Sequence, residues 1–183
     1  MSETAKYLSK QELKRFFASI KSPRDRAIFH LSYFRGLRAS EVGRLPMSAL
    51  KLREKRLFIR RLKGSAAAEF LLSDNEVRYL KAYLAERGTS PGPIFLSRRG
   101  LGISRQQLDL LIKKYCAEAG IDRAKAHMHV LKHSIATHLL QSGVHLLHVQ
   151  RLLGHKKLSS TEYYLHLTDN EVDEVAAQFY AGW

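Results

Sequence analysis

Helix-start signals recur along this chain and constrain its fold more than any other feature. Ser9, Ser73 and Thr168 are each followed three positions later by a glutamate, which is the spacing of a capping box. Apolar residues follow the first and last of these signals at helical intervals. Gly120 and Gly154 stand where helices are expected to end, since glycine favours the left-handed conformation of a helix C-terminus. The pattern therefore predicts a mainly helical chain.

The spacing of apolar residues also predicts the remaining elements. Helices are expected over residues 9–20, 23–35, a short stretch from 40, 73–87, 104–119, 130–141, 145–153, 159–165 and 169–180. Residues 56–62 and 69–72 are expected to form two strands, with Lys63 in the bend between them. The predicted fold class is mainly α with a small antiparallel β-sheet (α+β), and residues 1–183 are expected to form a single domain.

The charge of the chain favours a polyanionic partner. Its 31 lysines and arginines outnumber its 17 acidic residues, which gives a formal net charge of +14. Nucleic acid is the first candidate, and an anionic membrane surface is the alternative. No apolar run approaches the roughly 20 residues that cross a bilayer, and the start of the chain lacks a signal-peptide pattern. We therefore expect a cytoplasmic, nucleoid-associated protein with no membrane partner.

The cysteine and the histidines are the side chains of this chain most often used as metal ligands. Cys116 is the one cysteine, so an internal disulfide is excluded, and its apolar surroundings predict a buried thiol. Eight of the nine histidines lie between His127 and His166. No Cys pair and no H-E-x-x-H spacing accompanies them, so we expect neither a metal nor another cofactor.

Three separated segments of this basic chain offer groups suited to phosphodiester chemistry. Cleavage by a side-chain nucleophile requires neutralised nonbridging oxygens and an acid for the departing oxygen. Guanidinium, ammonium and imidazole groups meet both needs, and a tyrosine can hold the phosphate as an ester that is later resealed. The candidate residues are Arg38, His129, Lys132, His155 and Tyr164.

The same segments resemble the sequence boxes of the tyrosine recombinase, or phage integrase, family. Residues 36–41 (Gly-Leu-Arg-Ala-Ser-Glu) match its first arginine box, and residues 129–133 fall on its H-x-L-R-H box. Residues 152–155 match its L-L-G-H segment, and Tyr164 follows at the nucleophile position. Lys63, followed by a glycine, stands where the family keeps its general-acid lysine.

The resemblance implies the tyrosine recombinase/integrase catalytic-domain fold and site-specific recombination of double-stranded DNA through a 3′-phosphotyrosine intermediate. Tyr164 would attack the phosphate, and Lys63 would protonate the leaving 5′ oxygen. Arg38, His129, Lys132 and His155 would stabilise the phosphate or move protons. A homo-oligomer, a tetramer on paired sites, is implied, and DNA-bending accessory proteins are compatible with it.

The chain is most similar to small single-domain members of the family, such as the invertases of fimbrial switches. Only residues 1–7 precede the first predicted helix, so no separate N-terminal core-binding domain is expected. The apolar stripe of the last predicted helix would pack on its own domain or dock on a neighbouring protomer.

Lys132 departs from the family pattern, which has an arginine there. An ammonium is a point charge, whereas a guanidinium grips two phosphate oxygens through its planar fork. We therefore expect slowed cleavage. The alternatives are a non-catalytic DNA-binding regulator on the same fold and a related topoisomerase that relaxes supercoils.

Several of the individual assignments have structural alternatives. Tyr163 is adjacent to Tyr164, and because they lie about 100° apart on a helix only one can face the phosphate. The nine-residue step from His155 favours Tyr164. Arg38 could instead be a cation at a helix end, Lys63 a solvated hairpin residue, and the histidines at 129 and 155 core side chains.

Overall fold

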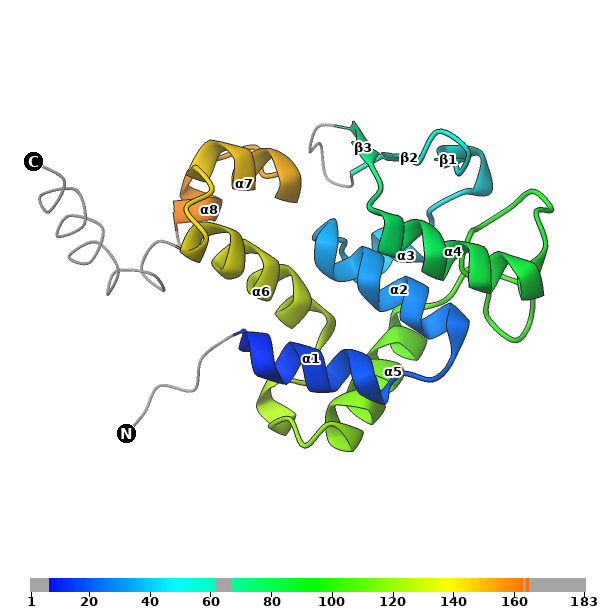
Figure 1. Ribbon diagram of the computed structural model, residues 1–183, viewed down its shortest axis with the longest axis horizontal. Coiled ribbons are helices and arrows are strands. Elements are labelled where there is room, and N and C mark those ends of the chain that lie inside the picture. Colours follow the sequence, from blue (N-terminus) through cyan, green and yellow to red (C-terminus); the bar gives the residue numbers. More distant parts are fainter. Residues whose placement is uncertain (1–6, 62–66, 163, 165–183) are drawn as a thin grey trace, which may run out of the picture.

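The computed structural model describes residues 7–61, 67–162 and 164, and these form a helical domain with one small sheet (Figure 1). The α-helices are α1 (Lys10–Ser19), α2 (Pro23–Phe34), α3 (Ala39–Val42), α4 (Asp74–Arg87), α5 (Arg105–Glu118), α6 (Met128–Gln141), α7 (Leu146–Leu153) and α8 (Ser159–Glu162). The strands are β1 (Leu50–Lys51), β2 (Arg56–Ile59) and β3 (Ala68–Leu71), and the short 3-10 helices are η1 (Met47–Ala49) and η2 (Arg123–Lys125). The predicted fold class is confirmed.

The predicted capping boxes account for two helix starts. At α1, the Glu12 backbone N–H donates to the Ser9 hydroxyl over 3.1 Å, and the Ser9 backbone N–H donates to the Glu12 carboxylate over 2.7 Å. Ser73 makes the same reciprocal pair with Glu76 at the start of α4. These bonds satisfy backbone donors that have no partner within the helix. The predicted box at Thr168, and the predicted helix after it, lie outside the described residues.

The sheet differs from the predicted hairpin in two ways. A third strand, β1, pairs antiparallel with β2, so the strand order is β1-β2-β3. The prediction that the first strand reaches residue 62 was wrong, since the ladder between β2 and β3 ends at the pair Ile59 and Ala68. Beyond Ile59 the chain leaves the ladder, and the Arg61 side chain turns into the protein interior.

The core is organised around α2, which packs against α4 and α6. Figure 1 shows α6, α7 and α8 on one side of α2, with α4 and the sheet on the other. Phe16 of α1 meets Phe29 of α2 edge to face, with ring centroids 5.2 Å apart. Cys116 is fully buried in α5, as predicted, and burial raises the pKa of its thiol to about 11.

Two glycines shape the segments that carry the candidate site. Gly36 ends α2 with φ +54°, and a Cβ there would lie 2.7 Å from Leu153 Cδ2. Gly154 ends α7 with φ +65°, where a Cβ would lie 3.0 Å from Arg61 Cγ. Both positions combine a left-handed backbone with a close neighbour, so a larger side chain would strain the backbone and force that neighbour to shift. The end of α2 and the end of α7 are thereby brought together.

The described residues contain no helix with the length and apolar character needed to cross a membrane.

Candidate active site

Arg38 lies in the turn between α2 and α3, as the N-cap residue of α3. Its Nη1 donates to Glu41 Oε1 over 3.0 Å, and its backbone N–H donates to Glu41 Oε2 over 2.9 Å. The Glu41 carboxylate is buried, whereas the Arg38 side chain is 30% exposed. One edge of the Arg38 guanidinium is therefore held by the protein while part of the group still reaches solvent.

Lys132 lies on α6 and is 5% exposed. Its Nζ donates to the main-chain carbonyl oxygen of Leu153, at the end of α7, over 2.9 Å. Burial, followed by the charges of Arg38 and Arg61, lowers the pKa of Lys132 to about 7. Near neutral pH this side chain is therefore divided between the ammonium and the amine.

His155 follows the left-handed turn at Gly154 and is partly buried. A 2.9 Å hydrogen bond joins its Nδ1 to Oγ1 of Thr161, which is fully buried in α8. Burial, then the charges of Lys132 and Arg38, lowers the pKa of His155 to about 4. At neutral pH the ring is therefore uncharged, and it can both donate and accept a proton.

Tyr164 lies beside this histidine. The two rings are stacked with centroids 6.5 Å apart and planes 9° apart, and the Tyr164 ring lies 5.5 Å from that of His133. The Tyr164 backbone N–H donates to the Thr161 carbonyl over 3.0 Å, and its side chain is 3% exposed. Tyr163, the alternative nucleophile, lies outside the described residues.

His129 lies on the first turn of α6, one turn before Lys132. The residue is exposed, but partial desolvation of its ring, then the neighbouring charges of His127 and Lys132, lowers its pKa, and Arg38 contributes in the same direction. Its ring therefore stands in the field of the same cations that act on His155. Lys63, the predicted general acid, lies outside the described residues.

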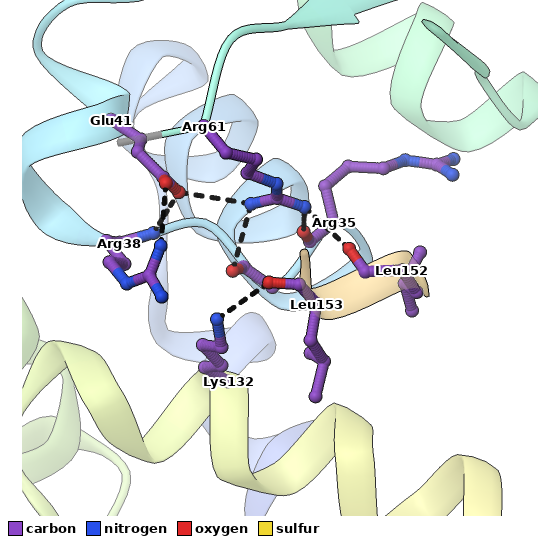
Figure 2. A network of polar contacts seen from close by, with 8 residues as sticks. Arg35, Arg38, Glu41, Arg61, Lys132, Leu152 and Leu153 are labelled. Carbon is purple, nitrogen blue, oxygen red and sulfur yellow. Dashed lines mark hydrogen bonds and ion pairs between the residues drawn. The ribbon is translucent and has the colours of Figure 1, made fainter. Parts of the chain in front are cut away.

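A buried arginine that was not predicted from the sequence, Arg61, lies at the centre of this group (Figure 2). Arg61 Nη1 donates to Glu41 Oε2 over 3.0 Å and to the Gly36 carbonyl over 3.2 Å. Its Nη2 donates to the Arg35 and Leu152 carbonyls, each over 2.6 Å. Arg61 thus satisfies the carbonyl groups at the end of α2. The Arg38 side chain instead bonds Glu41.

The alternation of β2 contained a signal for this arginine. Leu57 and Ile59 point inward and are buried, so Arg61 occupies the next inward position of the same period-two pattern. A charged residue at an inward position requires a buried partner. Glu41, which was predicted only as part of the arginine box, is that partner.

The electrostatic balance of the site favours an anion. Arg38 and Arg61 pair with the Glu41 carboxylate, and the charge of each of these two cations lowers the pKa of Lys132. Among the described residues of this group, cations therefore outnumber carboxylates. A phosphate placed against Arg38 and Lys132 would reduce the repulsion between them.

Comparison with known proteins assigns this arrangement to a family. The model of the phage integrase family matches residues 6–171. Tyrosine recombinase XerD of Xanthomonas campestris pv. campestris is 40% identical over 155 residues, which are 77% of this chain and 47% of that protein. XerD of Staphylococcus epidermidis is 31% identical over 197 residues, covering 97% of this chain and 66% of that protein. The chain thus spans about half to two thirds of the length of these curated relatives.

Solved structures agree with this assignment. The crystal structure of XerA recombinase aligns with a TM-score of 0.83 at 29% identity, covering 94% of this chain and 64% of that one. XerH site-specific recombinase, bound to palindromic difH substrate in a post-cleavage complex, aligns with a TM-score of 0.79 at 27% identity. That match covers 93% of this chain and 52% of XerH. The predicted integrase-type catalytic fold is confirmed, while the narrower likeness to fimbrial-switch invertases stays a prediction.

Proposed function

We propose that this chain, which belongs to the phage integrase family, is the catalytic part of a site-specific recombinase that cleaves and rejoins double-stranded DNA. The observation that carries the proposal is the stacking of Tyr164 on His155, a histidine whose pKa is lowered by burial and then by the charges of Lys132 and Arg38. A phenol, an imidazole and two cations in one place are the groups that phosphoryl transfer to a tyrosine requires.

Cleavage would begin with attack of the Tyr164 hydroxyl oxygen on the scissile phosphorus. The bond between phosphorus and the 5′ oxygen breaks as the 3′-phosphotyrosine ester forms. The neutral His155 ring can accept the phenolic proton, and a bound phosphate would offset the charges that lower its pKa. Lys63 would protonate the 5′ oxygen, and rejoining would reverse these steps. Because Tyr164 is 3% exposed, its hydroxyl must become accessible when DNA binds.

Arg38 and Lys132 would neutralise the nonbridging oxygens in the transition state, with His129 as a further donor beside them. Arg38 is already oriented by Glu41, so its exposed edge needs little rearrangement. Removing one such donor costs about 2.7–4 kcal/mol, which corresponds to roughly 100-fold to 1,000-fold in rate. We expect Arg38→Ala to reach this range.

The proposed partner is duplex DNA, bound by a tetramer on paired sites in the cytoplasm at the nucleoid. The net charge of +14 supports this partner, and XerH, at 27% identity, was solved bound to its difH substrate. Phosphate contacts by lysine and arginine release counterions, so the logarithm of the binding constant should fall linearly with the logarithm of the salt concentration. DNA-bending accessory proteins would assist assembly.

Covalent trapping on a nicked suicide substrate tests the proposal. The substrate carries DNA that flanks the gene of this protein, and the wild type is compared with Tyr164→Phe and Tyr163→Phe. We expect a denaturation-resistant adduct with the wild type and with Tyr163→Phe, and none with Tyr164→Phe. An adduct lost in Tyr163→Phe instead would reassign the nucleophile.

A second candidate function is DNA binding without cleavage, which the lysine at position 132 favours. A buried ammonium with a pKa of about 7 loses part of its charge at neutral pH, whereas an arginine keeps it. If Lys132 limits an active enzyme, Lys132→Arg should raise the cleavage rate by at least about tenfold, the equivalent of 1.4 kcal/mol. Salt-sensitive DNA binding with no adduct from either protein would support the second function.

A further inference from the structure

We propose that Arg61 is a positioning residue of this site, which orients Arg38 through Glu41 and fixes His155 through the end of α7. The inference rests on the proposed function, because the effect of Arg61 would be seen in DNA cleavage. Arg61 lies outside the family sequence boxes at residues 36–41, 129–133 and 152–155. Its side chain is 1% exposed, so it acts through its neighbours and not on DNA directly.

Arg61 acts on Arg38 through the Glu41 carboxylate. Its Oε2 accepts from Arg61 Nη1 at 3.0 Å and from the Arg38 backbone N–H at 2.9 Å, while its Oε1 accepts from Arg38 Nη1 at 3.0 Å. The carboxylate is buried, so a cation on the inner side is needed to keep it charged and in place. Without Arg61, the Glu41 carboxylate would lose its hydrogen bond from Nη1 and become less ordered. Arg38 would then lose its fixed orientation.

Arg61 acts on His155 through the C-terminal end of α7. Four carbonyls of a helix C-terminus have no partner within the helix, and here each is satisfied. The backbone N–H groups of Gly154 and His155 donate to Arg151 (3.2 Å) and Gln150 (3.1 Å), which is the pattern of a Schellman motif.

The other two carbonyls of this end accept from side chains. The Leu152 carbonyl accepts from Arg61 and the Leu153 carbonyl from Lys132, at 2.6 and 2.9 Å (Figure 2). His155 follows directly, so its ring position depends on how firmly this turn is held. Arg61 and Lys132 hold adjacent carbonyls, which couples the buried arginine to the lysine proposed to contact phosphate.

The geometry of a guanidinium suits this role better than that of an ammonium. Nη1 donates to Glu41 and Gly36, while Nη2 donates to Arg35 and Leu152, so one planar group joins segments from three parts of the chain. A lysine would present a single nitrogen and could not span these acceptors. The stem of Arg61 also packs under the Gly154 turn, since a Cβ there would lie 3.0 Å from its Cγ.

The test compares single-turnover cleavage of the suicide substrate, at saturating protein, with the Kd for the same DNA. Arg61→Met keeps the length and apolar character of the stem and removes the donors. We expect it to slow cleavage about 100-fold, the effect of a misplacement of about 1 Å, with a Kd within about twofold of the wild type. Arg56→Met is the matched control, because Arg56 begins β2, the strand that precedes Arg61, and pairs with Glu69 at the surface. It should leave cleavage unchanged.

A double-mutant cycle separates positioning through Arg38 from general destabilisation. If Arg61 acts partly through Arg38, then Arg61→Met should slow cleavage by less than about tenfold when Arg38 is already alanine. Effects that simply multiply would overturn the coupling. Slow cleavage is measurable because the suicide substrate accumulates the adduct irreversibly.

A double variant that removes both charges serves as the control for misfolding. Arg61→Met removes one of the cations that pair with the buried Glu41 carboxylate, whereas the double variant Arg61→Met with Glu41→Gln removes both charges. The double variant should melt cooperatively and still cleave slowly, since Arg38 has lost its anchor. Wild-type cleavage rates in either folded variant would overturn this inference alone. Absence of an adduct with the wild type would overturn the proposed function and this inference together.

Discussion

Replacing Lys132 by methionine should stabilise the fold in a pH-dependent way. Lys132 is 5% exposed and lies near the charges of Arg38 and Arg61, so folding at low pH forces a charge into an unfavourable environment. Methionine has a similar length and fills the same space without charge. The fall of the Lys132 pKa from 10.5 to about 7 corresponds to about 5 kcal/mol of cost to the folded state.

The sign and the pH window follow from proton linkage. Below pH 7 the lysine is protonated in both the folded and unfolded chains, so the full cost is present. Between pH 7 and 10.5 the unfolded chain binds more protons than the folded one, and the cost declines as pH rises. The stability advantage of Lys132→Met should therefore be largest at pH 6 and smallest at pH 10.

Urea unfolding of both proteins at these two pH values measures the effect. The difference in unfolding free energy between variant and wild type cancels the titrating groups that Lys132 does not influence. Its change between the two pH values therefore reports on Lys132 and on the histidines whose pKa it lowers, His129 and His155. Lys113→Met is the control, because Lys113 is exposed and pairs with Asp109 on α5. A difference between Lys132→Met and wild type that is equal at pH 6 and pH 10 would refute the argument from burial. If the difference between Lys113→Met and wild type changed with pH by the same amount, the argument would be refuted as well.

Two further predictions concern the residues around α7 and α8. Thr161→Val removes the hydroxyl that bonds His155 Nδ1 and preserves the side-chain shape. Single-turnover cleavage should therefore become about tenfold slower, with unchanged DNA affinity. An unaltered cleavage rate would show that the threonine does not orient the ring. Gly154→Ala should destabilise the protein by about 1–3 kcal/mol more than Gly120→Ala, as measured by urea unfolding. The φ angles are alike, +65° at Gly154 and +63° at Gly120, but only the added Cβ at 154 meets Arg61. Equal losses would show that the backbone conformation alone sets the cost.

Comparison of prediction and structure shows which features are local. The start of α1 at Lys10 follows from the Ser9 and Glu12 pair, whose two hydrogen bonds lie within four residues. The end of α7 at Leu153 follows from Gly154 for the same reason. Strand β1 was missed because it has two residues and is defined by its partner β2 rather than by its own pattern.

The amino-acid sequence by itself determined the helices, the basic character and the order of the family boxes, because capping, periodicity and motif spacing act over a few neighbouring residues. The tertiary structure decided which atoms meet. Arg61 reaches Glu41 across 20 positions and Leu152 across 91, and Lys132 bonds a carbonyl 21 positions away. Such contacts depend on how helices and strands pack in space, and packing brings together residues whose separation along the chain carries no sign of their proximity.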